Sequence, residues 1–162
     1  MLRRLTSLLA ITLAAASCGA DGKSATDREA DIYATLIRAL APADPAEHVP
    51  GGEIDQFDRV VFAGSLDDEQ AISLEVQAAV VEQLEEFATV RFVDERAEAI
   101  DHDDEGEPVL DDGVLVLVGP VPSGRSPSVD AERYVDNDDA VHVRVTLERP
   151  NGGWEVARIN AL

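Results

Sequence analysis

The first regular pattern of apolar positions in the chain begins near residue 27 and is helical. Its apolar side chains lie three or four residues apart and form one face: Ile32, Tyr33, Leu36, Ile37 and Leu40. This spacing predicts a helix over 27–41, which Pro42 ends because proline lacks the backbone N–H that a helix needs. Thr26 and Glu29 stand three residues apart and predict a capping box at its start.

A second helical pattern lies between two short apolar runs. Ser65 with Asp68 marks its expected start, and the pattern continues to about Ala88. Its apolar positions are Ile72, Val76, Ala79, Val80, Leu84 and Phe87. The flanking runs, 59–63 and 89–93, contain mainly Val and Phe and predict strands. Because strand–helix–strand units are nearly always right-handed crossovers between parallel strands, we expect these two strands to be parallel.

The C-terminal part of the chain carries strand patterns. Residues 114–118 are apolar on both faces, which is typical of a central strand. Over 141–147, Val and Leu alternate with polar residues, so one face of this strand is expected to be buried. A turn at 150–153 precedes 154–159, the expected hairpin partner. Residues 133–135 are a further candidate strand.

Together these elements predict one α+β domain over 27–162, with a mixed, mostly antiparallel sheet and two helices packed on one face. The aromatic side chains are assigned to its core: Tyr33, Phe62, Phe87, Phe92 and Trp154. The order of helix, strand, helix and then a strand-rich half that ends in a hairpin resembles the NTF2-like cone fold. This resemblance brings no catalytic residues with it.

The first 17 residues have the pattern of a bacterial signal peptide. Arg3 and Arg4 form a short basic region, and the apolar stretch 5–16 that follows is too short to span a bilayer. We therefore expect residues 1–17 to be removed on export.

The end of this leader, Ala15-Ala16-Ser17-Cys18, resembles the lipobox of bacterial lipoproteins. The resemblance implies that Cys18, the only Cys of the chain, carries a diacylglycerol thioether and becomes the new N-terminus, with palmitate-type chains as the sole membrane attachment. Residues 18–26 then form a tether. Ala15 stands where the pattern usually has Leu, and ordinary cleavage after Ala16 or Ala20 would instead give a secreted protein.

Two short segments are similar to segments of small, uncharacterised exported lipoproteins of high-GC bacteria. One is the Ile-Tyr-x-x-x-Ile-Arg stretch over 32–38, and the other is Gly-Val-Leu-Val over 113–116. The resemblance implies an address at the cell envelope and no particular activity.

The formal charge of the chain is -20, and removal of a leader with two Arg and no acidic residue gives -20 - 2 = -22. Such a chain repels nucleic acid, whose binding depends on Lys and Arg. It also repels anionic lipid headgroups, so membrane attachment has to come from acylation. Charged partners are expected to be cations or basic proteins. The composition fits either a GC-rich genome or adaptation to high salt.

One loop approaches a cofactor motif and fails. Residues 119–126, Gly-Pro-Val-Pro-Ser-Gly-Arg-Ser, match the phosphate-loop spacing except that Arg125 replaces Lys. Pro120 and Pro122 cannot donate the backbone N–H groups from which a phosphate cradle is built. We interpret 119–128 as a surface loop, and no cofactor is predicted.

The segment 94–112 is acidic, with 10 Asp or Glu among its 19 residues. Asp101, Asp103, Asp104 and Glu105 are weak candidates for a metal site, since Ca²⁺ prefers several oxygen ligands. The spacing of a Ca²⁺-binding EF-hand loop is absent, which favours a solvated loop. A second acidic run, 136–139, is interpreted as a hairpin turn.

The histidines give no metal pattern: His48, His102 and His142 lie in three separate contexts. His142 stands on the polar face of its strand, where a neighbouring carboxylate would make an acid–histidine pair. Ser65 is better explained as a helix cap than as a nucleophile, because no G-x-S-x-G elbow surrounds it.

We therefore expect a non-enzymatic module that binds a protein or a small ligand at the cell envelope. The alternatives are a cone-fold enzyme that uses an Asp–His pair, or an acidic, Ca²⁺-binding or salt-adapted surface protein.

Overall fold

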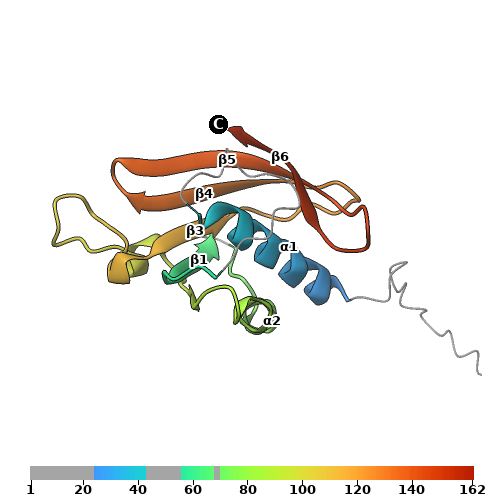
Figure 1. Ribbon diagram of the computed structural model, residues 1–162, viewed down its shortest axis with the longest axis horizontal. Coiled ribbons are helices and arrows are strands. Elements are labelled where there is room, and N and C mark those ends of the chain that lie inside the picture. Colours follow the sequence, from blue (N-terminus) through green and yellow to red (C-terminus); the bar gives the residue numbers. More distant parts are fainter. Residues whose placement is uncertain (1–23, 43–55, 68–69) are drawn as a thin grey trace, which may run out of the picture.

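The computed structural model describes residues 24–42, 56–67 and 70–162, which form two α-helices and one six-stranded sheet (Figure 1). The helices are α1 (Ala25–Leu40) and α2 (Leu74–Leu84). The strands, in chain order, are β1 (Val61–Ser65), β2 (Val90–Phe92), β3 (Val114–Val118), β4 (Ser128–Asp136), β5 (Asp139–Glu148) and β6 (Glu155–Ala161). The 3-10 helices η2 (Arg96–Ala99) and η3 (Leu110–Asp112) lie between β2 and β3.

The sheet is open, with its strands in the order β2-β1-β3-β4-β5-β6. β1 pairs in parallel with β2 and with β3, and the three remaining pairs are antiparallel. The predicted α+β class with a mixed, mostly antiparallel sheet is therefore confirmed. The chain runs from β1 through α2 to β2, so the predicted parallel pair is confirmed as well.

The strand patterns explain where each strand lies. All five residues of β3 are buried, and β3 lies between β1 and β4, as its apolar composition predicts. Along β5, Val143, Val145 and Leu147 are buried while His142 and Arg144 are exposed. β6 is the hairpin partner of β5, as expected. β4 is longer than the predicted 133–135.

The start of α1 differs from the prediction. Ser24, not Thr26, is the N-cap: its hydroxyl accepts a hydrogen bond from the Asp27 N–H (3.0 Å), and the Asp27 carboxylate accepts one from the Ser24 N–H (2.9 Å). The two candidate boxes overlap, and use of the earlier one lets the helix begin at Ala25. The first turn then carries Arg28, which contacts the loop 119–128.

The predicted start of α2 at Ser65 is wrong. Ser65 is the last residue of β1, and its hydroxyl accepts from the Asp67 N–H (3.2 Å) and donates to the Asp67 carbonyl (2.8 Å). A serine bonded to the backbone two residues on stabilises a turn rather than a helix. Ser73 caps α2 by accepting from the Val76 N–H (3.3 Å), and the helix ends at Leu84, before Ala88.

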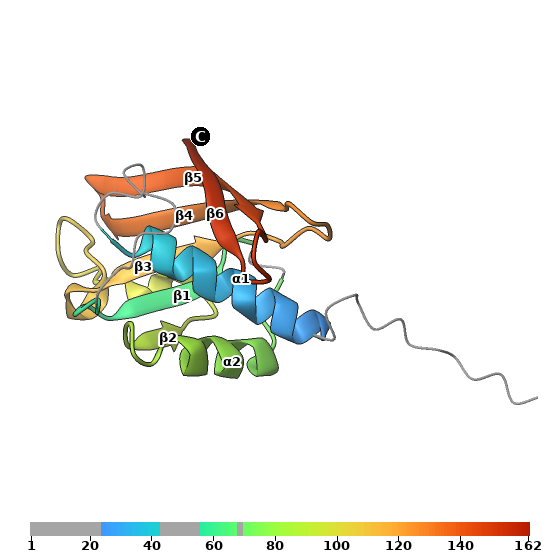
Figure 2. The same ribbon diagram turned by 45° about the vertical axis from the view of Figure 1, so that its right-hand side comes forward.

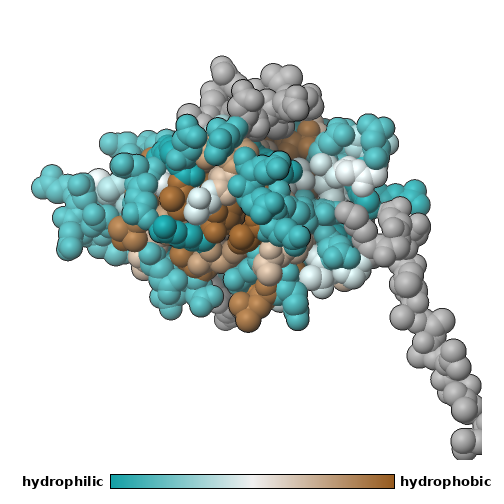
Figure 3. Space-filling model, turned by 60° about the horizontal axis from the view of Figure 1, so that its bottom comes forward, coloured by the Kyte–Doolittle hydropathy of each residue, from teal (hydrophilic) through white to brown (hydrophobic). Residues whose placement is uncertain are grey.

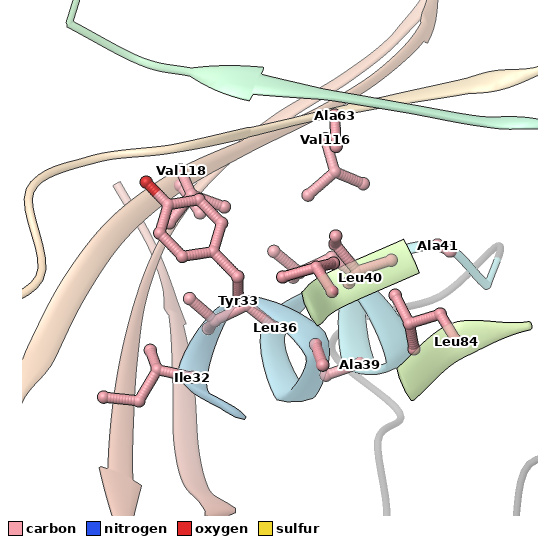
Figure 4. Packing of buried hydrophobic residues seen from close by; sticks show 14 of the residues in the cluster. Ile32, Tyr33, Leu36, Ala39, Leu40, Ala41, Ala63, Leu84, Val116 and Val118 are labelled. Carbon is pink, nitrogen blue, oxygen red and sulfur yellow. The ribbon is translucent and has the colours of Figure 1, made fainter. Parts of the chain in front are cut away.

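Both helices lie on the same face of the sheet (Figure 2). α1 contacts β3 and β6, and α2 lies beside α1 and contacts β2. The core between the helices and the sheet is almost entirely aliphatic. Figure 4 shows Leu36 and Leu40 of α1 and Leu84 of α2, with Val116 of β3 above them. Of the aromatic residues assigned to the core, Phe92 is only partly buried and the other four are buried.

Tyr33 brings a polar group into this core. Burial, and to a smaller extent the charge of Glu29, raises the pKa of Tyr33 to about 12. The phenol therefore stays neutral at physiological pH and behaves as a large core residue.

The opposite face of the sheet, called the outer face below, is covered only in part. Residues 94–112, called the acidic strap, place Ala99, Ile100 and Val109 against Phe62 and other apolar side chains of β1, β3 and β4. In the strap, φ is positive at three non-glycine residues: Glu107 (46°), Asp111 (57°) and Asp112 (50°). Left-handed backbone is unusual for residues other than Gly, and Asp tolerates it better than most. With its buried apolar residues and this defined backbone, the strap is a packed element with an acidic exterior.

No helix in the described part of the chain has the length and apolar character to cross a membrane. The predicted leader 1–17, Cys18, most of the tether and His48 lie outside the described residues.

Candidate functional site

A cleft of about 650 Å³ lies where three parts of the chain meet. They are the first turns of α1, the loop between β3 and β4, and the turn between β5 and β6; Figure 1 shows all three at the same end of the molecule. The lining residues are Arg28, Gly124, Arg125, Ser126, Glu148, Arg149, Pro150, Gly152 and Trp154. We call this hollow the arginine cleft, because three of its side chains are arginines.

Arg28 connects α1 to the loop between β3 and β4. Its Nη2 donates to the carbonyl oxygens of Pro122 (2.9 Å) and Gly124 (3.2 Å), and its guanidinium carbon lies 5.3 Å from the centre of the Trp154 ring. A guanidinium at this distance from an indole is within the range of a cation–π contact. The backbone and the ring together hold this side chain at the edge of the cleft.

Arg149 and Trp154 belong to the β5–β6 turn. The Nε and Nη2 atoms of Arg149 donate to the Gly152 carbonyl at 3.1 and 2.5 Å, and its guanidinium carbon lies 5.2 Å from the centre of the Trp154 ring. Gly152 has φ of 86°, a conformation that favours glycine. Trp154, the only Trp of the chain, is 9% exposed, and its Nε1 has no hydrogen-bond partner in the described part of the structure.

Arg125 differs from these two arginines. It is exposed on the loop between β3 and β4 and forms no ion pair with any residue that the structure describes. Glu148 is the one carboxylate among the lining residues given above. Three arginines and one glutamate give the lining a formal charge of 3 - 1 = +2, within a chain whose formal charge is -20.

The loop that approached a phosphate-loop motif therefore contributes to the cleft in a different way. Residues 119–127 form no helix, as predicted, and the carbonyl groups of Pro122 and Gly124 accept bonds from Arg28. Carbonyl oxygens repel a phosphate, so the loop backbone is no phosphate cradle at these positions. Its contribution is the exposed Arg125.

The outer face carries a second group of charged side chains. Glu132 of β4 has a side chain only 3% exposed, and its two carboxylate oxygens contact different partners. Oε1 accepts from Nη1 of Arg96 in the acidic strap, and Oε2 lies 3.6 Å from Nε2 of His142, its cross-strand neighbour on β5. Arg96 also lies over the ring of Tyr134, 4.3 Å from its centre. The enzyme alternative needs an Asp beside His142, and the carboxylate found there is Glu132 instead.

A third polar pair, Arg144 and Asp130, lies on the same two strands. Arg144 of β5 donates through Nε and Nη2 to both oxygens of Asp130 on β4, at 2.6 and 2.8 Å. The bonds from Arg144 hold the pKa of Asp130 below its usual value, and they raise the pKa of Arg144 above its own. The outer face of β4 and β5 is therefore a surface of paired charges.

Two of the four candidate metal ligands, Asp101 and Asp104, bond to backbone within the acidic strap, while Asp103 and Glu105 are exposed. Asp101 and Asp104 accept hydrogen bonds from the N–H groups two residues on, of Asp103 and Gly106, both at 3.0 Å. Glu107, not among the candidates, contacts His102 Nδ1 at 3.3 Å; this bond and one from Asn137 lower the pKa of Glu107. In the described ranges, no three His, Cys, Asp or Glu side chains are grouped so as to hold a metal ion.

An apolar groove of about 590 Å³ lies on the side of α2, next to the edge strand β2. Leu74 is 80% exposed, Val81 is 42% exposed, and Phe92 lines the groove with them. Figure 3 looks at this lower side of the molecule, where apolar side chains lie among polar ones.

Comparison with protein families, with curated proteins and with solved structures finds no match to this chain. The resemblances to exported lipoproteins and to the NTF2-like cone fold stay predictions. A functional proposal for the chain rests on the residues of its own surface.

The sequence patterns predicted neither the arginine cleft nor the contacts of Glu132 on the outer face. The arginines of the cleft come from positions 28, 125 and 149, so no linear motif links them. Glu132 was missed because the strand prediction began at 133, which left its alternation with the buried Val129 and Ala131 unnoticed. A period-two search extended back to Ser128 would have exposed this signal.

Proposed function

We propose that this chain is a non-enzymatic, lipid-anchored domain on the outer side of the cell membrane that binds a small ligand in the arginine cleft. The observation that carries the proposal is a hollow of about 650 Å³ that is lined by Arg28, Arg125, Arg149 and the sole Trp of the chain. Binding pockets for small molecules typically measure about 300–1,000 Å³ and place a few polar groups around an apolar wall.

The proposed address rests on the leader. A basic, then apolar segment over 1–17 that ends at Cys18 supports export followed by acylation. Mass spectrometry of the mature N-terminus tests this directly. We expect a lipid-modified Cys18 in the wild type and an unmodified N-terminus in Cys18→Ala. An unmodified wild-type N-terminus at Ser17 or Asp21 would show ordinary secretion instead.

Ligand binding can be tested through Trp154, because its indole N–H gives a single side-chain signal of its kind in a ¹H–¹⁵N spectrum. We would screen a fragment library that contains neutral, cationic and anionic compounds against the purified full chain. At least one class is expected to shift the indole signal together with the amides of Gly124 and Gly152. If the whole library leaves these three signals in place, the cleft is not a ligand site.

A second candidate function is supported by the contact of 3.6 Å between His142 Nε2 and Glu132 Oε2. A carboxylate that orients an imidazole is the arrangement of a general base. Because Glu132 also holds Arg96, a structural role explains the same geometry. The variant His142→Ala distinguishes the two roles. If His142 is a general base, the variant loses turnover of a substrate found by screening. If its role is structural, the variant keeps any such turnover, and ligand binding in the arginine cleft is unchanged.

A further inference from the structure

Arg28 and Arg125 line the arginine cleft, and neither forms an ion pair with a carboxylate of the residues that the structure describes. Four other arginines donate to carboxylates: Arg91 to Asp111, Arg96 to Glu132, Arg133 to Asp139 and Arg144 to Asp130. The acceptors that the structure shows for Arg28 are backbone carbonyls, which carry no net charge. Arg125 forms no ion pair with the residues that the structure describes.

The geometry of Arg28 leaves donors for a ligand. A guanidinium has five N–H donors. Both bonds given for Arg28 leave from Nη2, toward Pro122 and Gly124. Bonds to the loop and the contact with Trp154 restrict the rotamer of Arg28 without neutralising its charge. A side chain held in this way loses little further entropy when it binds a second group.

Resting on the function proposed above, we propose that the arginine cleft recognises a small ligand through one oxyanion group, a carboxylate or a phosphate. Arginine binds both groups with paired, charge-assisted hydrogen bonds. Arg28 of α1 and Arg125 of the loop between β3 and β4 both line the cleft, so an oxyanion there can be reached from two elements, and Trp154 adds an aromatic ring to the same lining.

The charge of the whole chain limits the size of this ligand. At physiological salt, charges act over about 8 Å, so an anion inside the cleft is influenced mainly by the arginines of the lining. A longer polyanion would extend over the acidic surface of a chain with formal charge -20 and be repelled. The cleft therefore selects small anions, and nucleic acids and extended acidic polymers are excluded.

The test is a titration of the full chain with benzoate, phenyl phosphate and benzamide, followed by the Trp154 indole signal. Benzamide has the shape of benzoate without its charge, so it isolates the contribution of the oxyanion. We expect benzoate and phenyl phosphate to shift the signal and to bind about tenfold more tightly than benzamide. A preference for phenyl phosphate identifies the phosphate source of the shared chemistry, and a preference for benzoate identifies the carboxylate source.

Matched variants test whether anion binding depends on charges in the lining of the cleft or on the net charge of the whole protein. Arg125→Gln removes an exposed charge from the lining and is expected to weaken benzoate binding about fivefold to tenfold. Arg158→Gln removes the same charge from an exposed position on β6 that does not line the cleft, and is expected to change binding less than about twofold. Glu148→Gln removes the acidic residue of the lining and is expected to strengthen binding.

The outcomes distinguish this inference from the proposed function. If benzamide binds as tightly as benzoate, or if Arg158→Gln weakens benzoate as much as Arg125→Gln does, recognition of an oxyanion by the cleft is wrong although the cleft still binds ligands. If neither these probes nor the fragment library moves the Trp154 signal, the proposed function fails with it.

Discussion

The two faces of the sheet remove apolar surface from water in different ways. The helix face is covered by α1 and α2, and the buried cluster there consists almost entirely of Ala, Val, Leu and Ile. The outer face is covered near β1 and β3 by the acidic strap, and over β4 and β5 it carries paired charges. The comparison shows how so acidic a chain can fold: one face supplies the burial, and the other combines a small apolar cluster with ion pairs.

An exception on the helix side sharpens this comparison. Arg133 of β4 is 1% exposed, and its Nη1 donates to Asp139 at 2.7 Å. Its Nε has no partner among the residues that the structure describes. A buried charge with one partner contributes little net stability, because desolvation offsets the attraction. Stability on this face is therefore expected to come from the aliphatic residues.

The largest loss of stability is expected from truncation of an aliphatic side chain on the helix face. Leu36→Ala removes a fully buried side chain between α1 and the sheet and should lower the free energy of unfolding by about 3–5 kcal/mol. Leu74→Ala is the matched control, since Leu74 is 80% exposed at the start of α2 and its loss should cost less than about 0.5 kcal/mol. Urea unfolding followed by Trp154 fluorescence measures both. Equal losses would mean that the helix face does not dominate stability.

The helix face was also the part that the sequence predicted well. Apolar spacing in the stretch from Ile32 to Leu40 and alternation from Val141 to Leu147 depend on burial of one face, and both patterns match the structure. Helix starts were less predictable, because more than one Ser or Thr at or before the start of each helix satisfies the same local rule. Ser24 and Ser73 are the caps used, and tertiary contacts such as those of Arg28 favour the α1 start.

The outer face and the cleft could not be predicted in this way. The Arg96–Glu132 pair joins residues 36 positions apart, and the bond from Arg28 to Gly124 joins residues 96 positions apart. Periodicity shows which face of an element is buried, but it does not show which elements meet at the end of the sheet. The acidic composition of 94–112 also concealed the buried residues Ala99, Ile100 and Val109.

An intermediate effect is expected where the acidic strap meets the outer face. Arg96→Gln leaves the buried Glu132 without its guanidinium and removes the contact with the Tyr134 ring, so we expect a loss of about 1–3 kcal/mol. Arg91→Gln breaks a pair with Asp111 whose side chains are 54% and 56% exposed, and it should cost less than about 1 kcal/mol. The same urea experiment compares them. Arg96→Gln unfolding no more easily than Arg91→Gln would show that burial of Glu132 gives its pair no more weight than an exposed pair of the strap has.

The smallest contribution to stability is expected from the exposed pair of Asp130 and Arg144, and it can be measured by its dependence on pH. Because hydrogen bonds from Arg144 lower the pKa of Asp130 in the folded state, the pair adds stability at pH values above about 4, the usual range of an Asp pKa. This stability is lost as the pH falls through the lowered pKa and the carboxylate is protonated. Unfolding midpoints of the wild type and Arg144→Gln should therefore differ slightly at neutral pH and converge in acid. Added salt should reduce the neutral-pH difference, since both side chains reach solvent. A difference that stays constant from neutral pH into acid would contradict the ion-pair explanation and assign the effect of Arg144 to packing on β5.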